Sequence, residues 1–316
     1  MWDVGEMIRR WKLSIGLLLS ISLMLGGCSF MNSQTNNKKA EEDEIFMPVQ
    51  DYTGQGFSFD NGEKTGEFAK KHREEIIKVV DQFFKKEYGL EVTPHNLVGA
   101  KNAVVVFVES KQEPYFHTSV VVGVNIENNK ISDDVFAYEG SVEGAIMSGL
   151  YVMAYEKEFK KLDEFCEMIA KKYPVVGMRQ EAVNNTRDTG YTTPYYYTST
   201  LSMDFPLAYN AYMKNHSIQK SDLRELIFKQ QFESEYAPDK NCIEISLTFY
   251  MKKRNSNPEK KLANDIIREF KQTKGLPPGN YAVFNQSNEI NKKTGLDKSY
   301  QGTTPGIDEI LIKLYK

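Results

Sequence analysis

The sequence predicts an α+β protein in which helices pack on mainly antiparallel sheets, after an N-terminal signal peptide and a flexible tether. Three observations support this fold class. Apolar residues recur at helical spacing in several segments, β-rich runs are separated by turn signals, and the strands are grouped rather than alternating regularly with helices. With 41% hydrophobic and 12% aromatic residues among 316, the chain belongs to the globular class.

The N-terminal segment has the pattern of a bacterial lipoprotein signal. Residues 9–12, mostly basic, precede an apolar stretch, 13–25, which ends in two glycines and Cys28. A membrane-spanning helix needs about 20 apolar residues, so this stretch is too short for a comfortable span. The pattern resembles the lipobox that a prolipoprotein signal peptidase cuts before cysteine. We therefore expect residues 1–27 to be removed and the Cys28 sulfur to carry a diacylglycerol.

Some alternatives stay open in this segment. Cys28 could be an ordinary cysteine that follows a cleaved secretory signal, or part of an uncleaved membrane anchor. Translation could begin at Met7 instead of Met1, which would leave a compact basic leader. The choice of start codon does not change the predicted lipidation.

The mature chain is predicted to begin with a lipid anchor and a tether, residues 28–50. Residues 29–44 are mostly Asn, Gln, Ser, Lys and Glu, with almost nothing to bury, which is typical of a flexible segment. One fatty chain binds a membrane only marginally, whereas two or three chains on Cys28 make the attachment persistent. We therefore expect a lipid-anchored protein on the extracytoplasmic face of the cell membrane.

Charge and cysteine content argue against a nucleic-acid-binding protein and against a disulfide scaffold. The net charge of −3 gives no general electrostatic attraction to nucleic acid, so no nucleic-acid partner is expected. Once Cys28 is lipidated, only Cys166 and Cys242 remain, so the chain is not a disulfide scaffold. Both lie in segments that suit a small buried side chain, and a bridge between them stays an alternative.

The globular region is predicted to cover residues 51–316, either undivided or as two subdomains, 51–175 and 176–316. Thr65 could cap the first helix, and Gly89 ends it. In chain order, we expect a helix at 65–88, strands at 103–109, 115–126 and 131–138, and helices at 141–155 and 157–173. The last two helices should turn Ile146, Leu150, Met153, Phe159, Leu162, Phe165 and Ile169 toward a core.

The periodicity loosens between residues 175 and 200, and no element is assigned there. In the last third we expect helices at 206–213, 221–230 and 258–273 and strands at 243–251 and 281–284. The run Gly-Leu-Pro-Pro-Gly at residues 275–279 should turn the chain into the last of these strands.

The sequence assigns no catalytic, cofactor-binding or metal-binding residue. The four histidines, His72, His95, His117 and His216, are scattered without metal-ligand spacing. Nucleophile motifs such as Gly-x-Ser-x-Gly and phosphate-binding loops do not occur in the sequence. His117 is the most suggestive of the four because it lies beside aromatic residues at a strand start, although a structural role is the simpler interpretation.

A stretch rich in tyrosine and threonine, residues 191–200, is the other candidate site. Its tyrosines are Tyr191, Tyr195, Tyr196 and Tyr197. Their rings could stack on sugars or peptides while hydroxyl groups bind the edges. The simpler interpretation is a strand whose tyrosines alternate between core and solvent. Together with His117, these tyrosines are the candidate ligand surface.

Four motifs, together with the lipobox, resemble a known family. They are residues 50–59 (Gln-Asp-Tyr-Thr-Gly-Gln-Gly-Phe-Ser-Phe), 113–118 (Glu-Pro-Tyr-Phe-His-Thr), 190–196 (Gly-Tyr-Thr-Thr-Pro-Tyr-Tyr) and 274–279 (Lys-Gly-Leu-Pro-Pro-Gly). The combination resembles a family of uncharacterised surface lipoproteins of low-GC Gram-positive bacteria, a domain of unknown function, over nearly the whole mature chain. The resemblance implies the membrane address and implies no activity, cofactor or catalytic residue.

Three functions are compatible with these features. The leading hypothesis is a non-enzymatic, lipid-anchored protein that binds an envelope protein, a glycan or a peptide. An envelope hydrolase built on His117 with Glu109 or Glu113 is the first alternative. A solute-binding lipoprotein of a transporter is the second, less favoured because that class usually repeats β-α units in parallel sheets across two lobes.

Overall fold

The computed structural model describes residues 44–188, 190–232, 242–298 and 312–314. The described residues, from 44 onward, form one compact unit. The predicted signal peptide, Cys28 and most of the predicted tether lie outside the described residues, and the division at residue 175 stays a prediction. In the described part of the chain, no helix has the length and apolar character that crossing a bilayer requires.

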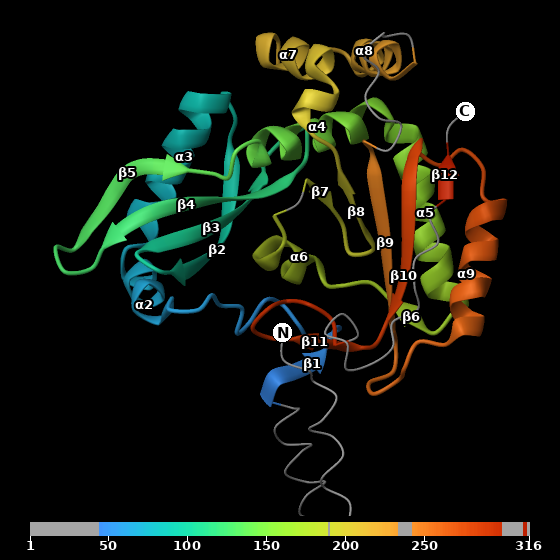
Figure 1. The fold of residues 1–316 in the computed structure, drawn as a ribbon, viewed down its shortest axis with the longest axis horizontal. Helices are drawn as coiled ribbons and strands as arrows, with labels where there is room; N and C mark the ends of the chain where they lie inside the picture. The colour runs from blue at the N-terminus through green and yellow to red at the C-terminus, as the bar shows by residue number, and fades with distance from the viewer. Residues whose placement is uncertain (1–43, 189, 233–241, 299–311, 315–316) are drawn as a thin grey trace, which may run out of the picture. The chain divides into compact units, whose positions relative to one another are not determined.

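The four-stranded sheet is antiparallel, in the order β2-β3-β4-β5. Its strands are β2 (Val92–Ala100), β3 (Ala103–Ser110), β4 (His117–Asn125) and β5 (Lys130–Phe136). Alternate residues such as Val104, Val106 and Val120 are fully buried, because successive side chains of a strand point to opposite faces. The helices α2 (Glu63–Lys71) and α3 (Arg73–Tyr88) pack on this sheet (Figure 1).

The predicted helix at residues 65–88 is in fact two helices, because the backbone leaves the helical region at His72 (φ −110°, ψ 25°). The His72 ring stacks on Phe68 at 4.3 Å between centroids, and its Nε2 lies 3.0 Å from Asn129 Oδ1. Phe68, Ile76 and Val80 are nevertheless all buried. Since the apolar stripe continues across the break, hydrophobic periodicity cannot reveal it.

The six-stranded sheet has the order β12-β10-β9-β8-β7, and β6 also pairs with β9. Its strands are β6 (Val175–Val176), β7 (Tyr191–Thr192), β8 (Tyr196–Ser199), β9 (Glu244–Met251), β10 (Gly279–Gln286) and β12 (Ile312–Leu314). Only β9 and β10 pair in parallel among these described strands. The helix α9 (Lys260–Gln272) provides the crossover that a parallel pair requires. The two sheets confirm the predicted α+β class with mainly antiparallel strands.

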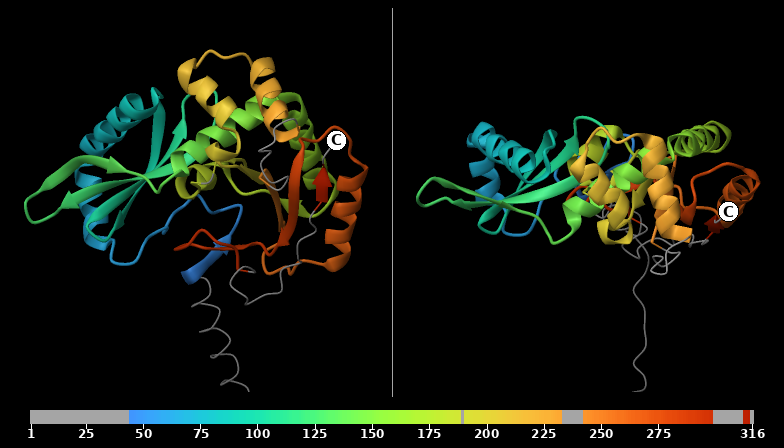
Figure 2. Two further views of the ribbon diagram at one scale, coloured as in Figure 1. Left: turned by 45° about the horizontal axis from the view of Figure 1, so that its top comes forward. Right: turned by 90° about the horizontal axis from the view of Figure 1, so that it is seen from above.

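Apolar helices lie at the centre of the core. The helix α4 (Ser141–Ala154) contacts β4 and β8, one strand from each of the two larger sheets, and also the helices α7 (Pro206–Lys214) and α8 (Lys220–Phe232). Most of its residues are buried, as expected for a helix that is apolar all round. The helices α5 (Glu156–Lys172) and α9 pack together beside the six-stranded sheet (Figures 1 and 2), with the rings of Phe165 and Phe270 5.6 Å apart. The residues predicted to face the core, Ile146, Leu150, Met153, Phe159, Leu162, Phe165 and Ile169, are all buried.

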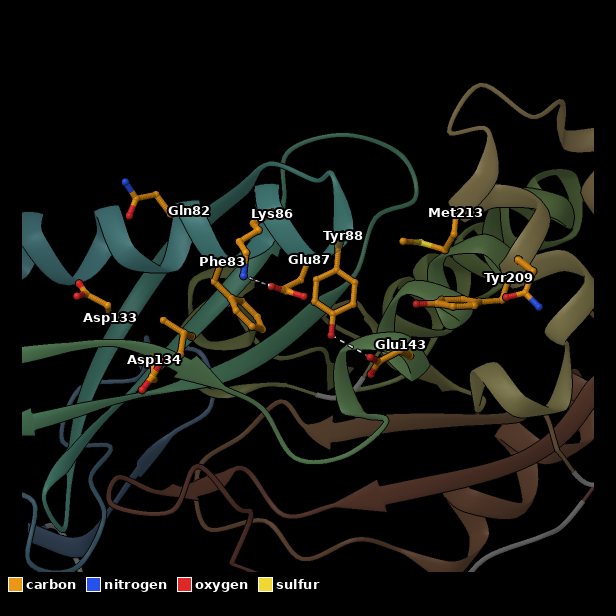
Figure 3. A pocket seen from close by; sticks show the side chains of 12 residues that line it. Gln82, Phe83, Lys86, Glu87, Tyr88, Asp133, Asp134, Glu143, Tyr209 and Met213 are labelled. Carbon is orange, nitrogen blue, oxygen red and sulfur yellow. Dashed lines mark hydrogen bonds and ion pairs between the residues drawn. The ribbon is translucent and has the colours of Figure 1, made fainter.

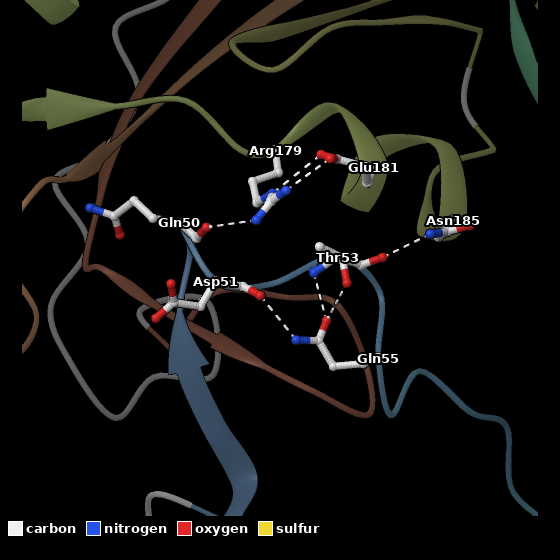
Figure 4. A network of polar contacts seen from close by, with 7 residues as sticks. All are labelled: Gln50, Asp51, Thr53, Gln55, Arg179, Glu181 and Asn185. Carbon is white, nitrogen blue, oxygen red and sulfur yellow. Dashed lines mark hydrogen bonds and ion pairs between the residues drawn. The ribbon is translucent and has the colours of Figure 1, made fainter.

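The first described residues are tied to the body of the protein. The strand β1 (Phe46–Pro48) pairs with β11 (Glu289–Asn291), so ordered structure extends into the last residues of the predicted tether. Residues 50–55 then lie beside the helix α6 (Gln180–Thr186), as Figure 4 shows. Asn185 Nδ2 donates to the Thr53 carbonyl at 2.8 Å, and Arg179 Nη1 donates to the Gln50 carbonyl at 3.5 Å. The first part of the motif at residues 50–59 therefore docks on α6 and on Arg179, which precedes it.

Several short elements are missing from the prediction, among them β6, α6, β1, β11 and β12, because each is too short to show a hydrophobic period. The strands β7 and β8 lie within residues 191–200, for which a strand is the simpler interpretation. The strand β2 is also missed because its register shifts between Pro94 and Leu97, and a proline within a run argues against a strand.

Cys166 and Cys242 are not joined by a disulfide bridge. The alternative of a bridge between them is therefore wrong. Cys166 is fully buried on α5. Burial raises the pKa of the Cys166 thiol well above its ordinary value. It therefore serves as a small apolar side chain of the core.

Candidate functional site

The strand β9 points one set of side chains into the main core and the other set into a pocket. Leu247 and Phe249 are fully buried in the core, whereas Ser246, Thr248 and Tyr250 line the pocket. This arrangement follows from the period of two along a strand. One face of the six-stranded sheet is therefore packed in the core, and part of the other face is hollow.

The register of the strands continues this face across the sheet. The paired positions are Tyr197 with Ser246, Phe284 with Thr248, and Gln286 with Tyr250. Directly paired residues of neighbouring strands project to the same face. Side chains from β8, β9 and β10 thus form a continuous floor for the pocket.

The pocket has a volume of about 350 Å³. Met178, Val183 and Arg187 form one wall, around the helix α6, and Leu296 and Asp297 form another after β11. Small-molecule sites typically have volumes of roughly 300–1,000 Å³. The pocket is therefore large enough for a small ligand and lies at the lower end of that range.

Gln286 is the most unusual polar group in the pocket. Its side chain is 9% exposed, and its Oε1 makes no hydrogen bond within the described residues. Beside it in register, burial raises the pKa of Tyr250 to about 12, and the charge of Arg187 opposes this shift only in part. Tyr250 therefore stays a neutral phenol over a wider pH range than an ordinary tyrosine. The Gln286 Oε1 itself is shielded from the space of the pocket, so the pocket meets other atoms of this residue.

The charged side chains of the pocket are engaged within the protein. Arg187 Nη2 donates to the Gly295 carbonyl at 3.1 Å and approaches Met178 Sδ at 3.8 Å. Arg187 also lies close enough to Tyr250 to lower its pKa in part, and Asp297 has a partner in the protein. These contacts make Arg187 and Asp297 part of the pocket wall.

The structure separates the tyrosines of the candidate ligand surface. Tyr195, Tyr196 and Tyr197 all border the pocket. The Tyr196 side chain, however, points to the core face beside Leu247, is 3% exposed and donates from its hydroxyl to Asp163 Oδ1 at 2.7 Å. Tyr191 does not line the pocket, and its ring lies 6.2 Å from that of Phe159 in the core. Tyr196 and Tyr197 belong to β8 and point to opposite faces, which confirms the strand interpretation.

His117 is buried away from the pocket, in a polar cluster. It is 4% exposed, and its Nε2 lies 3.1 Å from Asn184 Oδ1. Asn184 Nδ2 donates to Glu109 Oε2 at 3.3 Å, and His95 Nε2 lies 3.0 Å from the same oxygen. Burial lowers the pKa of His117, whereas the hydrogen bond with Asn184 and the charge of Glu109 raise it in part. His117 Nδ1 makes no hydrogen bond within the described residues.

Of the two carboxylates considered as partners for His117, only Glu109 lies in this cluster. It occupies the position opposite His117 in the register of β3 and β4. Glu113 instead pairs with Lys220 at 2.7 Å. The described residues contain no group of three or more His, Cys, Asp and Glu side chains that could hold a metal ion.

A second cavity, of about 650 Å³, lies between the end of α3, the strand β5 and the helices α4 and α7 (Figure 3). The Tyr88 hydroxyl donates to Glu143 Oε1 at 2.9 Å, and Lys86 pairs with Glu87 at 2.8 Å. Burial, followed by the hydrogen bond with Glu143, raises the pKa of Tyr88. All of the lining residues are exposed or half-buried. This cavity therefore lacks the buried acceptor that distinguishes the pocket on the six-stranded sheet.

The fold and the site define an α+β protein with a tyrosine-lined pocket on one face of a mixed sheet. The chain belongs to the DUF1672 family, described as proteins of unknown function, whose model matches residues 39–313. It is similar to the crystal structure of a DUF1672 family protein from Staphylococcus aureus subsp. aureus Mu50, with a TM-score of 0.70 and 23% sequence identity over 86% of this chain and 99% of that chain. Among curated proteins, none matches the chain. The predicted resemblance to a family of unknown function is confirmed, and lipidation stays a prediction.

Sequence reasoning did not identify Gln286, Arg187 or the polar residues of β9 as part of a site. One signal was available, since Ser246 and Thr248 interrupt an otherwise apolar strand at alternate positions. Such alternation indicates a strand with two different faces. The helix α6 that closes the pocket has no comparable signal, because it is only seven residues long.

Proposed function

We propose that this protein is a lipid-anchored, extracytoplasmic binding protein whose ligand site is the pocket on the six-stranded sheet. The observation that carries the binding role is a pocket of about 350 Å³ whose floor combines the rings of Tyr197 and Phe284 with the hydroxyls of Ser246 and Thr248. A few placed polar groups among aromatic and apolar side chains are typical of small-molecule sites. The opposite face of the sheet is filled by the core and leaves no room for a ligand there.

The anchor is proposed from the N-terminal pattern that ends at Cys28. A thioether-linked diacylglycerol would hold the protein in the outer face of the cell membrane, since two acyl chains bind persistently. The compact unit begins at residue 44. Residues 28–43 would then connect the lipid to the binding unit.

Binding without catalysis is favoured by the composition of the pocket. Its described lining contains threonine and serine hydroxyls but neither histidine nor cysteine. An activated nucleophile needs a base within hydrogen-bond reach. The hydroxyls of Ser246 and Thr248 are therefore more suited to accept and donate hydrogen bonds than to attack a substrate.

The anchor is tested by growing expressing cells with a labelled fatty acid and comparing the wild type with Cys28→Ser. We expect label on the wild-type protein, and we expect the serine variant to be unlabelled and released from the membrane fraction. An unlabelled wild type, or a serine variant that stays equally membrane-bound, would refute the anchor.

The binding role is tested with full-length protein in detergent and fractionated envelope glycans, peptides and proteins. The wild type should retain at least one fraction, and Tyr197→Ala should retain clearly less because Tyr197 lines the pocket. Tyr138→Ala is the matched control, since Tyr138 is 83% exposed and lies outside the pocket. Retention of nothing above background, or equal retention by Tyr197→Ala, would count against the role.

An envelope hydrolase remains a second candidate, and one observation favours it. His117 is linked to Glu109 through Asn184, so a base and a carboxylate are close together. In that case His117→Ala should abolish turnover of an envelope substrate while the protein stays folded, and unchanged turnover would eliminate the proposal. The solute-binding alternative has less support, because only one strand pair in the described sheets is parallel.

A further inference from the structure

We propose that residues 45–57 form a latch that joins the two walls of the pocket on the six-stranded sheet, so that the pocket opens when the latch leaves the fold. This inference rests on the proposed binding function and adds a control of access to the same site. The latch contacts the wall around α6, the wall after β11 and the side chains behind the pocket.

The latch holds the wall that surrounds α6. Asn185 Nδ2, on this helix, donates to the Thr53 carbonyl at 2.8 Å, and Arg179, just before the helix, donates to the Gln50 carbonyl (Figure 4). The two segments approach closely, since a Cβ added at Gly54 would lie 2.6 Å from Asn185 Cβ. With only seven residues, α6 is too short to be stable by itself, so tertiary contacts such as these must hold it in place.

The latch also holds the wall that follows β11. Lys292 N donates to the Ile45 carbonyl at 2.9 Å, and the Tyr52 hydroxyl donates to the Lys292 carbonyl at 3.1 Å. Further along, the Phe57 ring lies against Gly295, where an added Cβ would meet the ring at 3.4 Å. The same short segment thus binds both walls of the pocket.

Two apolar side chains of the latch fill the space behind the pocket. Val49 and Tyr52 are fully buried in the smaller cluster with Met178, Val183 and Tyr250. These three partners also line the pocket. If the latch left, the lining would lose its packing contacts on that side, and the wall around α6 would no longer be pressed against the sheet.

The wall would then swing outward without unfolding, because α6 is tied on its other side to the four-stranded sheet. Asn184 contacts His117 and Glu109, and Asn96 Nδ2 donates to the Asn185 carbonyl at 3.0 Å. None of these contacts involves a latch residue. Loss of the latch therefore frees one side of α6 while the other side stays attached.

The position of the latch gives this coupling a role. It includes the last residues of the predicted tether, 28–50, so the end of the chain that is proposed to carry the lipid leads directly into it. A pull from the membrane would act first on the pairing of β1 with β11, which is only three residues long. The anchored end of the protein would therefore set how readily the pocket opens.

The test measures access to the pocket floor through the thiol of Ser246→Cys. Ser246 lines the pocket and is 7% exposed, so this thiol should react slowly while the pocket is closed. Full-length protein in detergent is treated with iodoacetamide, and fragment ions distinguish the pocket thiol from Cys242. Cys166 is fully buried in the main core and reports global unfolding. We expect the pocket thiol to react faster than Cys166, because local opening is easier than global unfolding.

Two variants weaken the latch without removing an apolar side chain from the core. Tyr52→Phe deletes the hydrogen bond to the Lys292 carbonyl, and Asn185→Ala deletes the one to the Thr53 carbonyl. Each should speed labelling of the pocket thiol about three- to tenfold, as the loss of one hydrogen bond predicts.

Tyr151→Phe is the matched control. It deletes a similar hydrogen bond, from the Tyr151 hydroxyl to the Pro278 carbonyl, but in the main core, so it should leave the rate of the pocket thiol unchanged. Unchanged rates in both latch variants, or equal acceleration by Tyr151→Phe, would overturn the latch. The same conclusion would follow if the pocket thiol reacted as slowly as Cys166.

Hydrogen exchange of Tyr52→Phe, without the added thiol, is the second measurement. Peptides that cover α6 and residues 292–297 should both exchange faster than in the wild type, whereas those of β3 and β4 should not change. Faster exchange in only one wall would refute the joining of the two. Neither measurement needs a ligand, so a protein that retains no envelope fraction refutes the proposed function, whereas a latch variant without effect refutes only the latch.

Discussion

Tyr250 of β9 and Gln286 of β10 occupy paired positions of two parallel strands, and both side chains line the same pocket. The pairing places an amide oxygen that has no donor among the described residues beside a phenol whose pKa burial raises to about 12. Tyr250 belongs to the smaller buried cluster with Tyr52 and Met178, whereas Gln286 belongs to neither buried cluster. Gln286 can therefore be replaced without removing an apolar side chain from either cluster.

Gln286→Met is expected to raise the free energy of unfolding by about 1 kcal/mol. The substitution removes a buried acceptor that lacks a partner, and such a group costs about 1–3 kcal/mol, while the shape of the side chain is nearly kept. Urea unfolding of the variant, with Gln272→Met as an exposed control, measures the change. A less stable Gln286→Met protein would show that the amide is needed structurally.

Leu247→Ala and Thr248→Ala should differ strongly although the residues are adjacent. Leu247 is fully buried in the main core, so its truncation should cost about 2–5 kcal/mol. Thr248 is half-buried and faces the pocket, so its truncation should cost less than about 1 kcal/mol. Denaturant unfolding of both variants checks this, and similar losses would contradict the assignment of the two faces.

Gly99→Ala should destabilise the protein by several kcal/mol or prevent folding. A Cβ at Gly99 would collide with the backbone of Gly62 and Gly66, where α2 meets β2, and backbone atoms cannot move aside as a flexible side chain can. Overpacking of this kind typically costs about 1–3 kcal/mol and occasionally more. Thermal unfolding of the purified variant measures the loss.

Gly66→Ala is the matched control for that prediction. Gly66 lies in the helix α2, and its added Cβ would meet only ordinary contacts of 3.8 Å and 4.0 Å. Alanine is favoured over glycine in a helix interior by about 1 kcal/mol, so this variant should be slightly more stable than the wild type. A loss of stability comparable to that of Gly99→Ala would contradict the geometry of the contact.

The stability of the protein should fall as the pH is lowered through the ordinary pKa of histidine, near 6.5. Burial lowers the folded-state pKa of His117 below that value, so in this range the unfolded chain binds more protons than the folded one. Stability is therefore fully present above the unfolded pKa and is lost as the pH falls toward the folded pKa. Glu109, whose pKa is lowered first by its hydrogen bond with His95, contributes in a separate, more acidic window.

The measurement is urea unfolding between about pH 5.5 and 7.5 for the wild type and His117→Gln, since the ordinary pKa of histidine is about 6.5. Glutamine can still donate toward Asn184 Oδ1, which His117 Nε2 contacts at 3.1 Å, but it does not titrate. We expect a shallower pH dependence in the variant. Equal slopes would mean that His117 is not the group responsible.

Local sequence patterns identified the elements whose signal is long and periodic. The helices α4 and α5 appear at the expected residues, and their predicted core side chains are buried. The strand β6 and the helix α6 could not be predicted in this way because they are short, and the pairing of β8 with β9 joins residues distant in the chain. Tyr196, for example, pairs with Leu247, and no local period reports such a contact.

The sequence by itself determined the α+β class, the main helices and strands, and the expectation of a lipid anchor at Cys28. Each of these features depends on a contiguous run of residues. Only the tertiary structure decided that Tyr191 packs in the core, that His117 lies in a buried polar cluster and that Gln286 faces a pocket. The physical reason is that a site depends on which strands pair, in which register, and on which face a helix covers. These relationships join residues far apart in the chain, such as Met178, Tyr250 and Gln286, and they arise only when the chain is folded.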